Sequence, residues 1–265
     1  MSLLSDAYRA FFRRARGFGF GLGVFNRLHR LVWEGWLQPD FVEVDSMRFY
    51  LQGHDEAISD CLRMGEEYES AESRAFKERL RPGMTVFDLG ANIGFYSVLA
   101  SRLVGPAGRV YAFEPDHDNL WLLQRNIREN GCRNVEVCPY AVSESLGFAD
   151  LYRNDAAPSA HSIAVPPPGS AAGRRVVSVS LDGLFPPEVC PDFVKMDIEG
   201  AEFAALRGMR RMLADPRLSC VVLECLPSIL EKMRLSEGEI AAFLTGFGFT
   251  TSKLDAHNML ATRTR

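Results

Sequence analysis

Two carboxylates, Asp88 and Glu114, stand where they could bind a nucleoside-type cofactor. Asp88 lies two residues before Gly90, the first glycine of a Gly-x-x-x-Gly segment that ends at Gly94. At this point a carboxylate would repel the pyrophosphate of a dinucleotide but attract an ammonium group. The glycine spacing also differs from the Gly-x-Gly-x-x-Gly of nicotinamide enzymes. The methionine part of S-adenosylmethionine carries an ammonium group, so the pattern favours this cofactor.

Glu114 supports the same cofactor. It follows Arg109–Phe113, an apolar run typical of a second β-strand, and it precedes Pro115. An acidic residue at the end of that strand can accept hydrogen bonds from both ribose hydroxyls. A solvated turn residue is the alternative interpretation of Glu114 taken alone. Asp88 and Glu114 together predict a site for S-adenosylmethionine.

The neighbouring elements should place these residues at one edge of a sheet. Thr85–Leu89 is a short run of β-formers, and apolar residues recur at helical spacing from Phe95 onward. Such a strand, loop and helix presents free backbone N–H groups, and its glycines let a ligand approach the main chain. Tyr140, Ala141 and Val142 leave a third predicted strand at the same edge, where they are expected to line an adenine slot.

Three side chains are candidates for the base that takes a proton from a methyl acceptor. Asp197 and Glu224 follow or end the fourth and fifth predicted core strands. The carboxyl ends of parallel strands meet at the ligand edge of the sheet, so Asp197 is our first choice and Glu224 follows it. His161 lies in the irregular, proline-rich loop 153–174, a kind of loop that often binds substrate. A lone loop histidine is also often merely solvated.

Further charged residues surround Asp197. Lys195 precedes it by two positions and should share its side of the sheet, because side chains alternate along a strand. We interpret Glu199 and Glu202 as acidic residues in the first turn of the next helix, where they complement the helix dipole. A metal held by Asp197, Glu199 and Glu202 is a second interpretation, since hard cations favour carboxylates. We predict no metal.

The composition indicates one catalytic domain with an appendage. The chain has 265 residues, of which 47% are hydrophobic and 24% are charged, enough for one large core. The net charge of −4 gives no basic field, so we do not expect a nucleic-acid partner. The six cysteines include no Cys-x-x-Cys pair and are predicted to be reduced, in a cytoplasmic protein. We recognise neither a membrane span nor a signal peptide.

Residues 1–54 are predicted to form an extension ahead of a catalytic domain at 55–265. Apolar residues between Val24 and Val32 fall on one helical face, in a region rich in arginine and aromatic residues. This helix could lie on the inner face of a membrane or on a lipid-linked substrate. We favour a helix packed on the catalytic domain, because surface helices are ordinarily amphipathic. Whether the protein forms a homo-oligomer is left open.

The order of elements predicts the fold class. Strands that alternate with helices indicate an α/β protein with a doubly wound, mostly parallel sheet. The last two strands, near 249–253 and 258–262, are expected to form an antiparallel hairpin at its edge.

Five blocks of sequence occur in an order known from one enzyme family. They begin at Phe87, Ala112, Tyr140, Leu181 and Phe193, and they are Phe-Asp-Leu-Gly-Ala-Asn-Ile-Gly-Phe-Tyr-Ser, Ala-Phe-Glu-Pro, Tyr-Ala-Val-Ser, Leu-Asp and Phe-Val-Lys-Met-Asp-Ile-Glu-Gly-Ala-Glu. With these blocks the chain resembles the FkbM-type family of S-adenosylmethionine-dependent methyltransferases, over roughly residues 55–226. The resemblance implies a class I methyltransferase (Rossmann-like) fold with a seven-stranded sheet. It also implies O-methylation of hydroxyls of sugars or polyketide-type metabolites.

The cofactor site expected from these patterns and from the resemblance includes Glu69, which follows Tyr68 in a family element ahead of the first strand. The other expected cofactor-binding residues are Asp88, Gly90, Ala91, Asn92, Gly94, Phe95, Tyr96, Glu114, Pro115, Tyr140, Ala141, Val142 and Asp197. The first forty residues and the proline-rich loop fall outside the resemblance. The identity of the acceptor therefore cannot be carried over from the family.

Our leading hypothesis is O-methylation of a hydroxyl on a saccharide, a glycan or a glycan-like metabolite, with lipid linkage of the acceptor left open. N-methylation is an alternative, although enzymes acting on such nitrogens commonly carry Asn/Asp-Pro-Pro-aromatic where this chain has Asp197-Ile-Glu-Gly. A cofactor-binding scaffold without catalysis is the other alternative, because the sequence does not define an acceptor site.

Overall fold

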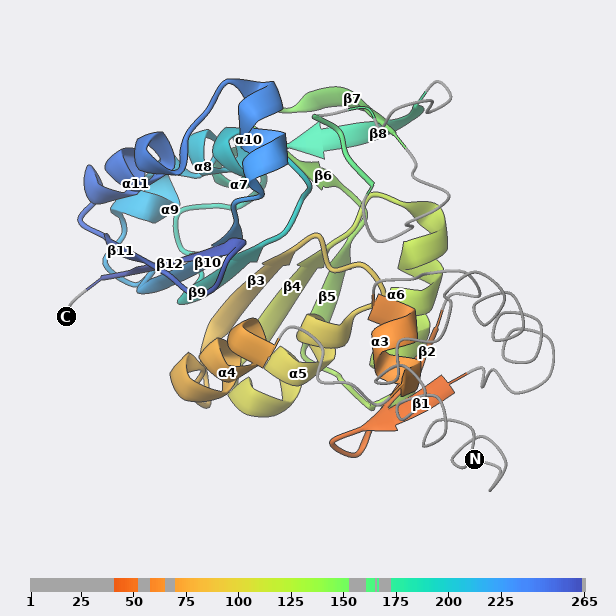
Figure 1. Ribbon diagram of the computed structural model, residues 1–265. Coiled ribbons are helices and arrows are strands. Elements are labelled where there is room, and N and C mark those ends of the chain that lie inside the picture. The colour runs from red at the N-terminus through yellow and green to blue at the C-terminus, as the bar shows by residue number, and fades with distance from the viewer. Residues whose placement is uncertain are drawn as a thin grey trace, which may run out of the picture.

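The computed structural model describes residues 41–51, 58–64, 70–152, 161–164, 166 and 173–263. Its centre is a seven-stranded sheet in the order β11-β12-β10-β9-β3-β4-β5 (Figure 1). The parallel strands are Cys220–Glu224 (β10), Phe193–Met196 (β9), Thr85–Leu89 (β3), Arg109–Phe113 (β4) and Val135–Cys138 (β5). Asn258–Thr262 (β12) pairs antiparallel with β10 and with Thr250–Lys253 (β11). The mostly parallel sheet and its antiparallel terminal hairpin are confirmed.

Helices cover both faces of the sheet because the buried strands alternate between two apolar cores. Val86 and Val110 face one core, and Phe87 and Tyr111 face the other. The first core packs against Ser70–Arg79 (α4), Phe95–Val104 (α5) and His117–Glu129 (α6). The second packs against Leu181–Leu184 (α7), Glu202–Arg207 (α8), Arg210–Ala214 (α9), Pro227–Met233 (α10) and Glu237–Thr245 (α11). In Figure 1, α4 and α5 lie below the sheet and α8 to α11 above it.

A small second sheet lies beside the carboxyl ends of the main strands (Figure 1). It has the order β6-β8-β7, formed by Ala141–Val142 (β6), Arg174–Val179 (β8) and Gly147–Leu151 (β7). This separate sheet was not predicted from the sequence. A β-bridge between Tyr152 and Ser162 continues from β7. This bridge fixes the segment that carries His161.

An N-terminal hairpin packs against α6. Its strands are Phe41–Val44 (β1) and Met47–Tyr50 (β2), and Ile58–Met64 (α3) follows. The Tyr50 backbone N–H donates to Oδ1 of Asn126 at 2.7 Å, and Nδ2 of Asn126 donates to the Ile93 carbonyl at 2.8 Å. The hairpin also contributes buried residues to the first core, so residues 41–51 pack with the domain that carries the main sheet. The boundary at residue 54 stays a prediction, and the amphipathic helix expected near 24–32 lies outside the described residues.

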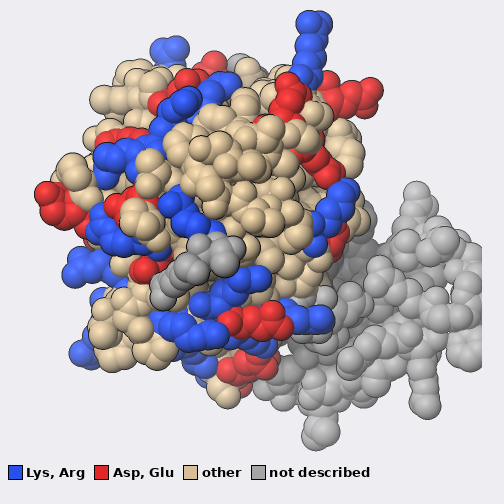
Figure 2. All heavy atoms as spheres, turned by 90° about the vertical axis from the view of Figure 1, so that its left-hand side faces the viewer, with Lys and Arg blue, Asp and Glu red and all other residues tan. Residues whose placement is uncertain are grey.

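The surface shows no separation of charge on the face that carries α11 and the C-terminal strands. Figure 2 shows Lys and Arg side chains interspersed with Asp and Glu side chains there, around an uncharged area. Among the helices that the structure describes, none combines the length and the apolar character that crossing a membrane requires.

Candidate active site

A cavity of about 400 Å³ lies at the carboxyl ends of β3, β4, β9 and β10. This volume falls within the range of about 300–1,000 Å³ that is usual for small-molecule sites. The predicted site residues that line it are Gly90, Ala91, Asn92, Phe95, Tyr96, Glu114, Pro115, Tyr140, Ala141, Val142, His161, Asp197 and Glu224. Residues that sequence patterns brought together from separate segments of the chain therefore share one cavity.

The glycine loop is pressed against the end of β9. Gly90 has a φ of +81°, and a Cβ atom built on it would stand 1.8 Å from the carbonyl oxygen of Asp197. The Asp197 backbone N–H in turn donates to the Leu89 carbonyl at 3.0 Å. Only glycine fits here, because there is no room for a Cβ atom and because the positive φ is unfavourable for other residues. The contact places Asp197 beside the loop predicted to bind cofactor.

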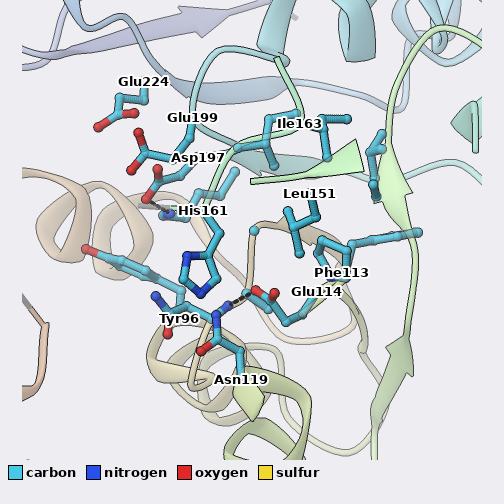
Figure 3. Close-up of a pocket in the computed structure, with 18 of the residues that line it drawn as sticks. Tyr96, Phe113, Glu114, Asn119, Leu151, His161, Ile163, Asp197, Glu199 and Glu224 are labelled. Carbon is cyan, nitrogen blue, oxygen red and sulfur yellow. Dashed lines mark hydrogen bonds and ion pairs between the residues drawn. The ribbon is translucent and has the colours of Figure 1, made fainter. Parts of the chain in front are cut away.

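Glu114 lies at the opposite end of the cavity from the other acidic side chains (Figure 3). Its Oε2 accepts the Asn92 backbone N–H at 2.9 Å, and its Oε1 accepts the Asp116 backbone N–H at 2.8 Å. Burial, opposed by these hydrogen bonds, raises the pKa of Glu114 from its ordinary value near 4.5 to about 7. Each carboxylate oxygen can accept more than one hydrogen bond, so Glu114 retains capacity for two ribose hydroxyls.

The residues around the glycine loop fit S-adenosylmethionine in their donor and acceptor chemistry. The buried Oδ1 of Asn92, which lines the cavity, has no hydrogen-bond partner within the described ranges. Buried polar atoms are rarely left in that state, so this oxygen suits a ligand that donates a hydrogen bond.

Two predicted cofactor residues do not line the cavity, and a third cannot be placed. Asp88 is fully buried and accepts a hydrogen bond from the Ser97 hydroxyl at 2.6 Å, and burial raises the pKa of its carboxyl. Gly94 begins α5 with a φ of +90°, and a Cβ atom there would stand 2.6 Å from Leu123. Both residues therefore shape the loop from behind. Glu69 lies outside the described residues.

Three carboxyl groups gather at the other end of the cavity (Figure 3). Asp197, Glu199 and Glu224 each have a carboxylate oxygen within 4.8 Å of the others. The Lys195 ammonium pairs with Oδ2 of Asp197 at 2.9 Å and lies 4.8 Å from the centre of the Tyr96 ring. The expectation that Lys195 shares the cleft side with Asp197 is confirmed.

The interpretation of Glu199 and Glu202 as a helix first turn is wrong for Glu199. Residues 198–200 form a tight turn ahead of α8, which begins at Glu202. Glu202 turns away from the other carboxyls, because its two oxygens accept the backbone N–H groups of Ile198 and Gly200. The alternative metal set of Asp197, Glu199 and Glu202 is therefore not assembled, and Glu224 lies where Glu202 was expected. Our prediction of no metal stays a prediction.

Glu199 and Glu224 of this cluster hold their protons more tightly than usual. The pKa of Glu199 is raised from 4.5 to about 8, mainly by burial and to a smaller extent by the Asp197 and Glu202 carboxylates. Burial, followed by Asp197 and Glu199, raises the pKa of Glu224 as well. Near neutral pH the cluster can therefore share protons, which is the property that a general acid or base needs.

Sequence patterns missed several residues of the cavity wall. These are Ile58 and Cys61 of α3, together with Phe113, Asn119, Leu151, Ile163, Ile198 and Glu199. Asn119 had a detectable signal, since it lies in the first turn of a helix that follows a predicted ligand residue. Ile58, Cys61, Leu151 and Ile163 depend on how α3 and the small sheet pack over the edge, which no local pattern encodes.

The sheet order and the residues around the glycine loop define a methyltransferase of class I, dependent on S-adenosylmethionine. The family described as Methyltransferase FkbM domain matches residues 88–251. The chain belongs to this FkbM methyltransferase family. The predicted family, fold class, enzyme class and cofactor are thereby confirmed.

Individual relatives cover different shares of the chain. The 31-O-demethyl-FK506 methyltransferase FkbM of Streptomyces tacrolimicus is 30% identical over 206 residues, which are 64% of this chain and 74% of that protein. Ribosomal RNA large subunit methyltransferase E of Nitrosomonas eutropha is 34% identical over 134 residues, covering 48% of this chain and 61% of that protein. The solved structure of methyltransferase FkbM from Methylobacillus flagellatus KT is 18% identical with a TM-score of 0.49. That match covers 77% of this chain and 52% of the solved one, so the chain spans about half of its length.

Proposed function

We propose that this protein transfers the methyl group of S-adenosylmethionine to a hydroxyl oxygen of a saccharide, a glycan or a glycan-like metabolite. The observation that carries the proposal is the single cavity in which the glycine loop and Glu114 face a cluster of carboxyl groups. One end suits the cofactor and the other suits a ligand that donates hydrogen bonds. Hydroxyl groups are such donors.

The cofactor end is assigned as follows. When bound, S-adenosylmethionine supplies a methyl group on a positively charged sulfur. Glu114 would accept the ribose hydroxyls, and Tyr140, Ala141 and Val142 would line the adenine slot. The loop residues Gly90, Ala91 and Asn92, with Phe95, Tyr96, Pro115, Asp197 and Glu69, complete the proposed cofactor site, and Asp88 and Gly94 shape its loop from behind.

The charge and the lining residues of the acceptor end support a hydroxyl as the proposed acceptor. Asp197, Glu224 and His161 line it and remain the candidates for proton transfer from the acceptor. Its carboxyl groups disfavour an anionic group beside the reacting oxygen. Elsewhere in the cavity, Leu151 and Ile163 pack with Ala141 and add apolar surface that excludes water, and the cavity orients the acceptor; both effects accelerate a transfer reaction.

The name of the S. tacrolimicus relative, 31-O-demethyl-FK506 methyltransferase, describes a methyl transfer to oxygen. This supports a hydroxyl acceptor here. We propose a sugar-type hydroxyl because several carboxyl oxygens at one end of the cavity match a ligand with several hydroxyl donors. Lipid linkage of the acceptor, membrane contact through the N-terminal helix, a cytoplasmic location and homo-oligomer formation belong to this proposal as predictions.

Transfer of labelled methyl from S-adenosylmethionine to a panel of acceptors tests the proposal. The panel should contain neutral methyl glycosides, oligosaccharides and polyketide alcohols, with matched amines and an RNA fragment. Labelled methyl ethers are the expected product. Product only on nitrogen would refute the O-methylation proposal, and cofactor binding without any transfer would favour the non-catalytic scaffold.

A further inference from the structure

Glu199 has a backbone conformation that long side chains seldom adopt. Its φ is +52°, and the following Gly200 has a φ of +102°. Left-handed backbone at a residue other than glycine persists only where the surroundings impose it, and such residues concentrate at functional sites. Here the residue lines the cavity of the proposed active site.

Three hydrogen bonds impose this conformation. Oε1 of Glu202 accepts the Ile198 backbone N–H at 3.0 Å, and Oε2 of Glu202 accepts the Gly200 backbone N–H at 2.9 Å. The Ser162 hydroxyl donates to the Glu199 carbonyl at 2.5 Å. The peptide group after Glu199 is thus held at both its N–H and its carbonyl, by the Glu202 carboxylate and by the segment next to His161, and the peptide group before Ile198 is held by the same carboxylate.

The side chain that this turn presents differs from those of Asp197 and Glu202. Lys195 occupies one oxygen of Asp197, and backbone N–H groups occupy both oxygens of Glu202. Neither carboxylate oxygen of Glu199 has a hydrogen-bond or ion-pair partner among the residues that the structure describes. Figure 3 shows Glu199 beside Asp197 and Glu224 at one end of the cavity. Glu199 and Glu224 are therefore the carboxyls most available to an acceptor hydroxyl, and Glu199 is the one that a strained turn holds in the cavity.

We propose that Glu199 is the catalytic residue that takes the proton of the acceptor hydroxyl, and that Glu202 and Ser162 are positioning residues that hold its turn. This inference rests on the proposed O-methylation. The hydroxyl oxygen forms its bond to the methyl carbon, and the electron pair of the breaking carbon–sulfur bond stays on sulfur. The hydroxyl proton passes to a carboxylate oxygen of Glu199 and later to solvent.

The charges around Glu199 set its working pH. Asp197, directly after β9, and Glu224 of β10 cluster with it, the charges of Glu202 of α8 and Lys195 of β9 also act on it, and His161 lines the same cavity. Burial and the surrounding carboxylates raise the pKa of Glu199 to about 8, against the opposing effect of Lys195. The ionised, proton-accepting form thus increases as the pH rises through about 8, and turnover should rise with it.

Glu199→Gln keeps the shape of the side chain and removes its capacity to accept the proton. We expect kcat to fall by about 100-fold or more and the rise of activity with pH to disappear. The affinity for S-adenosylmethionine, measured by calorimetry, should stay within about twofold. Glu231→Gln, at an exposed glutamate of α10, is the matched control and should leave all three quantities unchanged.

Two further variants separate catalysis from folding. Glu199→Asp retains a carboxyl, and aspartate tolerates left-handed backbone better than most residues. Compared with Glu199→Gln, it should therefore recover part of kcat and the increase of activity with pH. Asp197→Asn removes a charge that raises the pKa of Glu199. Activity of this variant should still increase with pH, but the increase should occur at lower pH. Isotope-labelled carboxyl NMR of the cofactor-free protein should show the same displacement of the Glu199 titration, independently of turnover.

The inference is overturned if folded Glu199→Gln keeps more than about a tenth of wild-type kcat. It is also overturned if Asp197→Asn abolishes the rise with pH while Glu199→Gln retains it, since Asp197 would then be the base. Activity lost on chelation and restored by Mg²⁺ would overturn it too, in favour of a metal role for the carboxyls. The proposed function fails separately, if wild-type protein methylates no hydroxyl in the acceptor panel.

Discussion

Replacing Glu114 by glutamine tests the cofactor end of the site most directly. In the wild-type protein both carboxylate oxygens accept backbone N–H groups, from Asn92 at 2.9 Å and from Asp116 at 2.8 Å. Glutamine has one oxygen and one NH₂ group, so either orientation sets a donor against a backbone donor. A buried N–H left unsatisfied in this way costs about 1–3 kcal/mol of folding stability.

The same replacement weakens the proposed contact with the ribose hydroxyls. Hydrogen bonds to a charged group contribute about 1.5–3 kcal/mol, so loss of this contact should raise the Kd for S-adenosylmethionine by about tenfold to 150-fold. Because burial raises the pKa of Glu114 to about 7, lowering the pH through 7 should weaken cofactor binding to the wild-type protein. Glu114→Gln should lack this pH dependence.

Calorimetric titration with S-adenosylmethionine between pH 6 and 8, with thermal unfolding of the same samples, measures both effects. Glu136→Gln, at an exposed position on the neighbouring strand β5, serves as the control. A folded Glu114→Gln protein whose Kd stays within twofold of wild type would refute the ribose assignment.

Three other predictions concern the framework of the site. Gly90→Ala should lower the free energy of unfolding by at least about 1–3 kcal/mol in urea titration, because the new Cβ would meet the Asp197 carbonyl at 1.8 Å. Asn126→Ala should lower the free energy of unfolding by about 1–3 kcal/mol, because it leaves the Tyr50 N–H and the Ile93 carbonyl without their partner. Limited proteolysis should then cut within residues 41–51 more readily. The Tm of the cofactor-free protein should fall as the pH rises from about 5 to 8. The pKa values of Glu114, Glu199 and Glu202 are raised in the native state, which therefore keeps protons that the unfolded state has already lost. Each such carboxyl contributes at most about 1.4 kcal/mol per pH unit.

Each of these framework predictions has a contrary outcome. Wild-type stability of Gly90→Ala would mean that the loop can move away from β9. Unchanged proteolysis of Asn126→Ala would mean that the apolar contacts of the hairpin hold it without this side chain. A Tm that rises between pH 5 and 8 would contradict the direction of the three pKa shifts.

The sequence was sufficient for the sheet and for the cofactor end because both depend on local patterns. The apolar runs that became β3 and β4 lie between clear turn residues, and buried parallel strands are uniformly apolar. The carboxyl ends of parallel strands share an edge, so strand order and residue type together predict that Glu114 and Asp197 line one site. Asp88 lies on the predicted strand, but its burial behind the loop depends on Ser97 and on the helix that follows.

The acceptor end was harder to predict because long-range contacts build it. Glu199 resembles a helix-capping residue in the sequence, and its orientation depends on a hydrogen bond from Ser162, which lies 37 residues earlier. Ile58 and Cys61 reach the cavity only because α3 packs over the edge of the sheet. Neither contact leaves a periodic signal in the sequence.

The Gly90 contact couples the two ends of the site. The Asp197 carbonyl that rests on Gly90 lies two residues before Glu199, within the same short connection between β9 and α8. A displacement of the glycine loop would therefore also move the turn that holds Glu199. If Glu199 accepts the proton, a substitution at Gly90 should affect turnover more than cofactor affinity, because it displaces the Asp197 carbonyl and with it the turn of Glu199. Gly90→Ala should accordingly lower kcat by a larger factor than it raises the Kd for S-adenosylmethionine, whereas independent ends would leave kcat at saturating cofactor unchanged.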